Sequence, residues 1–108
     1  MNKSHIIRKW RITEMEQWDQ DFIDAEVPGY IDFSKNGMGE FQFGYVHGFI
    51  DCRYSVREGI DTVEFSWEGN DEMNPAFGRG SAIIKDGNIS GHLSFYGGDD
   101  SGFKAIRT

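Results

Sequence analysis

Residues 39–56 read GEFQFGYVHGFIDCRYSV, and this stretch decides the fold of the chain. Alternation of apolar and polar residues is typical of a strand with one buried face, so the stretch predicts a β-hairpin. Two strands cannot bury such a face alone, so the rest of the chain must supply the opposing surface. The alternating residues form two sets, separated by an expected break at His47-Gly48: Phe41, Phe43 and Tyr45, then Ile50, Cys52, Tyr54 and Val56.

The segment before the hairpin contains a strand and then a change of period. In residues 6–14, Trp10 and Ile12 alternate with polar neighbours, which predicts a first strand with Trp10 pointing inward. Within residues 15–26 the apolar positions recur at intervals of three and four, which predicts a short amphipathic helix or a loop with one helical turn. Pro28-Gly29 ends this segment.

The remaining strands are short and are joined by turn residues. Residues 68–80, EGNDEMNPAFGRG, are rich in Gly, Asn and acidic residues and are expected to form a long irregular loop. Asn-Gly, Glu-Gly and Asp-Gly pairs indicate tight turns. Strands are predicted at residues 30–33, 61–67, 81–85, 89–96 and 103–107, with turns at residues 35–37, 57–59 and 86–87.

The strand succession predicts an all-β fold, a single small up-and-down antiparallel β-barrel of about eight strands with one short helical segment after the first strand. An open sheet would expose two aggregation-prone edges, and closure removes them. We expect residues 1–108 to form one domain. Such a barrel is wide enough to be filled by side chains or to hold one small ligand. A five-strand barrel of oligonucleotide-binding type is the structural alternative.

The composition limits the classes of partner. Eighteen acidic and 11 basic residues give a net charge of -7, and the basic residues form no dense run. Nucleic acids and anionic membranes are therefore not expected as partners, since phosphate contacts need clustered Lys and Arg. Cys52 is the single cysteine, and no apolar run is long enough for a signal peptide or a membrane span. Both observations favour the cytoplasm.

Several long phrases resemble those of a widespread family of small bacterial proteins for which no activity is established. The resemblance covers nearly the whole chain and implies no reaction. The phrases are WRITEMEQWDQDFID (10–24), VPGYIDF (27–33), GEFQFGYVHGFIDCRY (39–54), VEFSWEGNDE (63–72) and GDDSGFKAIR (98–107).

A looser resemblance is to the calycin barrels, which include lipocalins, fatty-acid-binding proteins and avidins. Those barrels share a Trp near the start of the first strand and an Arg near the end of the last, and Trp10 and Arg107 stand at these places. The resemblance implies that the pair closes one end of the barrel as a structural clasp, with a cation–π contact. Arg8 stands where those families have a Gly.

An aromatic set has two alternative interpretations, a plain core or the wall of a ligand cavity. Fatty-acid-binding proteins carry a helical lid after the first strand, so the resemblance implies that residues 15–26 cover the barrel mouth. Trp18 and Phe22 would then lie at the mouth. The candidate ligand-binding residues are Trp18, Phe22, Phe41, Phe43, Tyr45, Phe65 and Trp67.

No catalytic residue and no cofactor are expected. Cys52 would need one of three histidines (His5, His47 or His92) as its base, but its position in the strand predicts a buried thiol. Metal binding is not expected either, because the acidic residues lack the spacing of a calcium loop and suit turns in their own right. The weak candidates for metal ligands are Glu68, Asp71, Glu72, Asp99 and Asp100.

Two functions from different classes are consistent with these features. The first is a non-enzymatic protein that binds a small apolar or amphipathic molecule inside the barrel. The second is an acidic protein-interaction module, such as an inhibitor or an immunity-type protein, that uses its acidic loops against a basic surface. An enzyme ranks third, because no nucleophile, base and orienting group can be assembled. The sequence does not indicate the oligomeric state.

Overall fold

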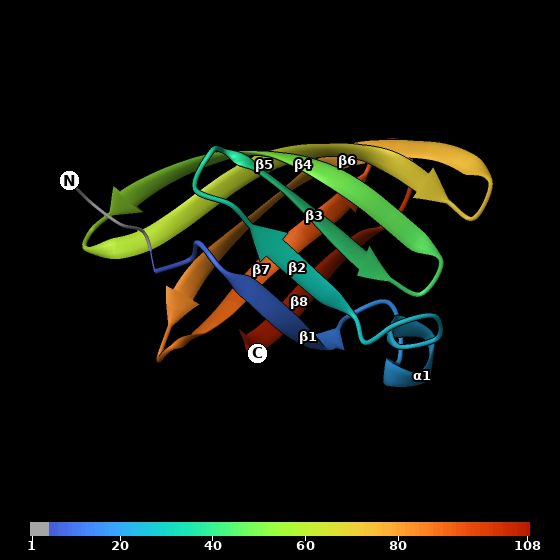
Figure 1. The fold of residues 1–108 in the computed structure, drawn as a ribbon, viewed down its shortest axis with the longest axis horizontal. Helices are drawn as coiled ribbons and strands as arrows, with labels where there is room; N and C mark the ends of the chain where they lie inside the picture. The colour runs from blue at the N-terminus through green and yellow to red at the C-terminus, as the bar shows by residue number, and fades with distance from the viewer. Residues whose placement is uncertain (1–4) are drawn as a thin grey trace.

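The computed structural model describes residues 5–108, which form a closed antiparallel barrel with strands in simple succession (Figure 1). This architecture confirms the predicted eight-stranded up-and-down barrel with one short helix after the first strand. The elements are β1 (Lys9–Met15), α1 (Gln20–Ile23), β2 (Tyr30–Phe33), β3 (Met38–Phe43), β4 (Val46–Arg57), β5 (Ile60–Asp71), β6 (Asn74–Lys85), β7 (Asn88–Phe95) and β8 (Asp100–Arg107).

The barrel closes between its first and last strands. Trp10 lies opposite Arg107, and Ile12 lies opposite Ala105, with a register shift between Ile12 and Glu14. The strands differ in length: β4, β5 and β6 are each 12 residues long. Their hairpins therefore project at opposite ends of a molecule that measures 40 × 23 × 20 Å (Figure 1).

Two of the tight turns adopt the backbone conformation that their sequences demand. Glu58 and Gly59 have φ of 53° and 79°, and Asp86 and Gly87 have φ of 55° and 82°. Positive φ at both central residues is the geometry of a hairpin turn that matches the twist of the strands. Both turns were predicted at these positions.

The expected break at His47-Gly48 is wrong. The turn lies at Gly44-Tyr45, where Gly44 has a φ of 57°, and β4 runs without interruption from Val46. Gly48 is glycine for a packing reason, since a Cβ there would collide with the rings of Phe41 and Trp67. Tyr45 consequently lies in the turn and not in the apolar register of β3.

The expectation of an irregular loop at residues 68–80 is also wrong. Residues 60–71 and 74–85 form the paired strands β5 and β6, joined by a turn at Glu72-Met73. Two glycines of this segment lie within the strands, at positions where the neighbouring backbone leaves no room for a side chain. A Cβ on Gly69 would collide with the His47 carbonyl oxygen, and one on Gly78 with the Ser94 carbonyl oxygen.

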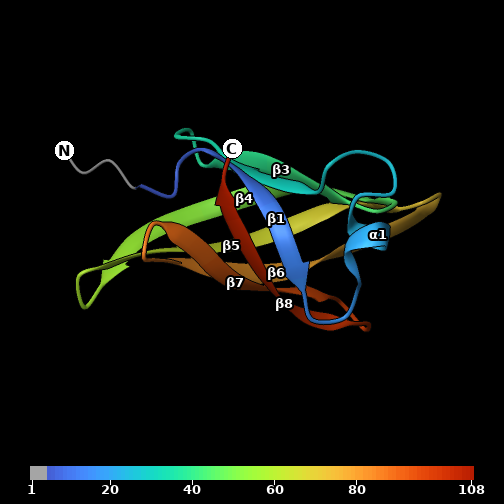
Figure 2. The same cartoon turned by 90° about the horizontal axis from the view of Figure 1, so that it is seen from below.

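The short helix α1 lies beside the end of β1 (Figure 2). The helix has four residues, so most of the 15–26 segment is not helical. Of the two predicted alternatives, the structure therefore corresponds to a loop with one helical turn. Asp19 caps it, because its carboxylate accepts a hydrogen bond of 3.0 Å from the Phe22 N–H. Ile23 is fully buried and anchors the helix to the core.

Candidate functional site

The barrel interior is filled by side chains. Four of the aromatic residues proposed as cavity lining (Phe41, Phe43, Phe65 and Trp67) are buried there. Phe41 and Trp67 pack edge to face with ring centroids 5.0 Å apart. An interior void lined by residues including Phe41 and Phe43 has a volume of about 10 Å³. Such a void has room for at most one water molecule, whereas ligand pockets are typically about 300–1,000 Å³.

Trp18 closes the end of the barrel beside α1. Its ring centroid lies 4.9 Å from that of Phe43 and 5.9 Å from that of Phe95, and the Phe22 ring follows at 6.2 Å. Tyr45 packs edge to face against Phe22 at 6.0 Å from the neighbouring turn and is 45% exposed. Trp18 and Phe22 thus lie at the barrel mouth, where they pack on the filled core.

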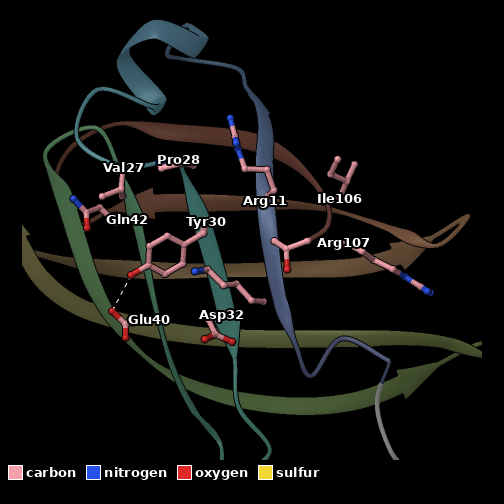
Figure 3. A pocket seen from close by; sticks show the side chains of 11 residues that line it. Arg11, Val27, Pro28, Tyr30, Asp32, Glu40, Gln42, Ile106 and Arg107 are labelled. Carbon is pink, nitrogen blue, oxygen red and sulfur yellow. Dashed lines mark hydrogen bonds between the residues drawn. The ribbon is translucent and has the colours of Figure 1, made fainter.

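Trp10 and Arg107 are register partners on β1 and β8, as a clasp would require. Trp10 is fully buried, and its indole N–H donates a hydrogen bond of 2.9 Å to the Ile6 carbonyl oxygen. The cation beside its ring, however, is the Arg8 guanidinium, 5.9 Å from the ring centroid. Arg107 is exposed and extends outward (Figure 3).

Cys52 and the histidines do not form a nucleophilic site. Cys52 is 7% exposed, and burial raises the pKa of its thiol to about 11, which keeps it protonated at neutral pH. Two of the histidines are paired with carboxylates instead: His47 Nε2 lies 2.9 Å from Glu40 Oε2, and His92 Nε2 lies 2.9 Å from Asp100 Oδ1. His5 is exposed near the N-terminus.

Four of the five acidic residues considered as metal ligands lie in or next to a turn, and Glu68 lies within β5. Glu68, Asp71 and Glu72 belong to the β5–β6 hairpin, and Asp99 and Asp100 lie where β8 begins. Within residues 5–108, no group of three or more His, Cys, Asp or Glu side chains is placed to hold a metal ion. In the same range, no helix has the length and the hydropathy needed to cross a membrane.

One surface groove, of about 590 Å³, lies over β1, β2 and β3 (Figure 3). Some of its polar groups contact one another. The Tyr30 hydroxyl donates a hydrogen bond of 3.0 Å to Glu40, and the Lys9 ammonium lies 4.5 Å from the centroid of the Tyr30 ring. Hydrogen bonds from His47 and Tyr30 lower the pKa of Glu40, while desolvation and the nearby Glu40 raise the pKa of Tyr30 to about 12. The Glu40 carboxylate in this groove is therefore held by hydrogen bonds to Tyr30 and His47.

A larger groove, of about 850 Å³, lies on β5 and β6 and reaches the neighbouring strands β4 and β7. Aromatic rings with large exposed fractions line it: Phe49 is 56% exposed, Phe77 53% and Tyr96 78%. Phe77 and Tyr96 are stacked with centroids 4.9 Å apart and an interplanar angle of 15°. The outer face of the barrel thus carries a stacked aromatic pair that is largely exposed.

These exposed aromatic residues form one row across the sheet, which we call the outer aromatic row. Phe49 on β4 lies opposite Glu68 on β5, and Glu68 lies opposite Phe77 on β6. Tyr96 continues the row, because its N–H donates a hydrogen bond of 2.8 Å to the Phe77 carbonyl oxygen. The row comprises Phe49, Glu68, Phe77 and Tyr96.

The aromatic members of this row were not among the residues predicted to form a site. Their signal is an apolar residue in the outward phase of its strand: Phe49 stands between the inward positions Gly48 and Ile50. For Phe77 that signal exists only once β6 is known to include residues 74–80. The row therefore depends on a register that the sequence alone did not provide.

Fold and site together define a small, closed, eight-stranded antiparallel β-barrel with a filled interior and an aromatic groove on its outer face. Comparisons of the chain with protein-family models, with curated proteins and with solved structures give no match. The resemblances to a bacterial family and to calycins thus identify no family for this chain, and the fold is established by its own topology.

Proposed function

We propose that this protein is a non-enzymatic binding protein that acts through its outer surface, as an acidic protein-interaction module. The observation that carries the proposal is the contrast between the two sides of the barrel wall. The interior void of about 10 Å³ has no room for an organic ligand, whereas the outer groove has about 850 Å³ and an aromatic lining. Aromatic side chains are enriched at the centres of protein interfaces.

The net charge indicates what kind of partner to expect. A chain with a charge of -7 attracts basic surfaces and repels acidic ones over about one Debye length, roughly 8–10 Å at physiological salt. The filled interior removes support from the other hypothesis, an apolar ligand held inside the barrel. A cytoplasmic location belongs to the same proposal and rests on the single, buried Cys52.

Binding of a partner purified from the source cells tests the proposal. We expect a stoichiometric complex that weakens strongly between about 0.05 and 0.5 M salt, because screening removes the attraction between opposite charges. The double variant Phe77→Ala/Tyr96→Ala should weaken it at constant salt. Val56→Ala, which truncates a side chain of the β4–β5 hairpin that is as exposed as Phe77, is the matched control. A partner bound equally by all three proteins, with no salt dependence, would contradict the proposal.

A further inference from the structure

We infer that the outer aromatic row is the contact point for the partner and that it receives an arginine or lysine side chain from a basic segment of that partner. This inference rests on the proposed function, which it makes specific. It gives a binding role to Glu68 and to its aromatic neighbours Phe49, Phe77 and Tyr96, whose side chains are exposed and lie outside the barrel core.

Glu68 is the central residue of the row. Its side chain is exposed, and it makes no hydrogen bond or ion pair with any described residue. Phe49 and Phe77 are its register partners on either side, and neighbouring strands lie about 4.8 Å apart. Directly opposite residues on a sheet hold their Cβ atoms about 4.5–5.5 Å apart. The Glu68 side chain therefore leaves the outer face of the sheet between those of Phe49 and Phe77, and the Phe49 ring also packs on His47 with ring centroids 5.0 Å apart.

A carboxylate between aromatic rings has the chemistry of a cation site. The faces of aromatic rings attract cations within about 6 Å, and the carboxylate supplies a full opposite charge. The stacked rings of Phe77 and Tyr96 extend this surface by a second ring at the outer end of the row. A guanidinium fits best, since its plane stacks on a ring while its N–H groups bond the carboxylate.

The charges around the row favour a basic segment over a single isolated cation. Glu68 and Arg79 are the only charged side chains among the described residues that line this groove, and they form no ion pair. The chain as a whole carries a net charge of -7, and Asp51, two residues from Phe49 along β4, adds a carboxylate on the same outer face. Asp51 lies opposite Ser66, two residues before Glu68 on β5, and Glu72 lies in the turn of the hairpin that carries Glu68. Several positive charges of one segment can therefore be accommodated.

Fluorescence anisotropy with a labelled hexa-arginine peptide, at about 0.1 M salt, tests the assignment. We expect Glu68→Gln to weaken binding about fivefold or more, since it removes the paired charge and keeps the shape. Glu14→Gln removes one charge from an exposed position of β1, four strands away in the barrel, and should change the affinity less than about twofold. Phe77→Ala should weaken binding about threefold to tenfold, with Val56→Ala as its control.

The outcomes separate the inference from the proposed function. Equal losses for Glu68→Gln and Glu14→Gln, or no loss for Phe77→Ala, would mean that only overall charge attracts the peptide and would overturn the inference. A purified partner that binds the wild type, Glu68→Gln and Phe77→Ala equally would also overturn it, while a salt-dependent complex would leave the proposed function in place. Failure to bind any protein partner would overturn both. Thermal unfolding of each variant confirms that the barrel is intact.

Discussion

Asp24 joins three parts of the chain through one carboxylate. It accepts hydrogen bonds from the Gly29 N–H at 2.8 Å and from Gln20 at 3.0 Å, and it forms an ion pair of 2.7 Å with Arg11. Desolvation opposes ionisation of this group, but the hydrogen bonds from Gly29 and Gln20 and the Arg11 charge together lower its pKa. The carboxylate thereby ties α1 and the following loop to β1.

Asp24→Ala should lower the free energy of unfolding by about 1–2 kcal/mol at pH 7, because the backbone donor of Gly29 and the Arg11 charge lose their partner. A lowered folded-state pKa means that this stability is present above the unfolded pKa and is lost as the pH falls through the folded one. The difference from wild type should therefore narrow below about pH 4. Urea unfolding at several pH values measures the difference in the free energy of unfolding between Asp24→Ala and the wild type, with Asp21→Ala as the control. A difference that does not change with pH would contradict this role of Asp24.

At the scale of strands, large aromatic rings inside the barrel lie over glycines of neighbouring strands. The rings of Phe41 and Trp67 cover Gly48, and the Phe65 ring covers Gly80. A ring and a glycine together fill the space that two medium-sized side chains would otherwise share. This pairing explains how so many aromatic residues fit inside a small barrel without leaving a cavity.

Gly48→Ala should therefore lower the free energy of unfolding by about 1–3 kcal/mol, since the added methyl group has to displace two packed rings. Gly102→Ala is the matched control: it also lies in a strand, but the nearest atom to a Cβ there is 3.7 Å away. We expect the control to change stability by less than about 1 kcal/mol. Equal effects in chemical denaturation would show that Gly48 is set by backbone preference and not by packing.

The same glycines mark what the sequence could and could not predict. Residues 30–33 were predicted as a strand, and β2 spans these residues, because its alternation and flanking turns are local signals. Gly48 and residues 68–80 were misread as a break and a loop, since the rings and carbonyl groups that require glycine there come from distant parts of the chain. The outer aromatic row was missed for a related reason: it exists only when β4, β5 and β6 are in register.

At the scale of the whole molecule, Trp18 decides whether the barrel is closed at the end beside α1. Trp18→Ala should lower the free energy of unfolding by about 2–4 kcal/mol, because it removes a large ring packed on Phe43 and Phe95. Tyr45→Ala, at an exposed turn position nearby, should cost less than about 1 kcal/mol. Thermal and urea unfolding compare the two variants. A neutral Trp18→Ala would mean that the barrel end is open in solution.

The claim central to this account is that the barrel is filled and binds through its outer surface. The mass of the protein purified gently from its own cells, compared under native and denaturing conditions, tests it most directly. The account predicts a native mass of 12.3 kDa, or a whole-number multiple of it, with no small molecule released on denaturation. A discrete excess mass that disappears on denaturation would reveal a bound small molecule and would contradict the account.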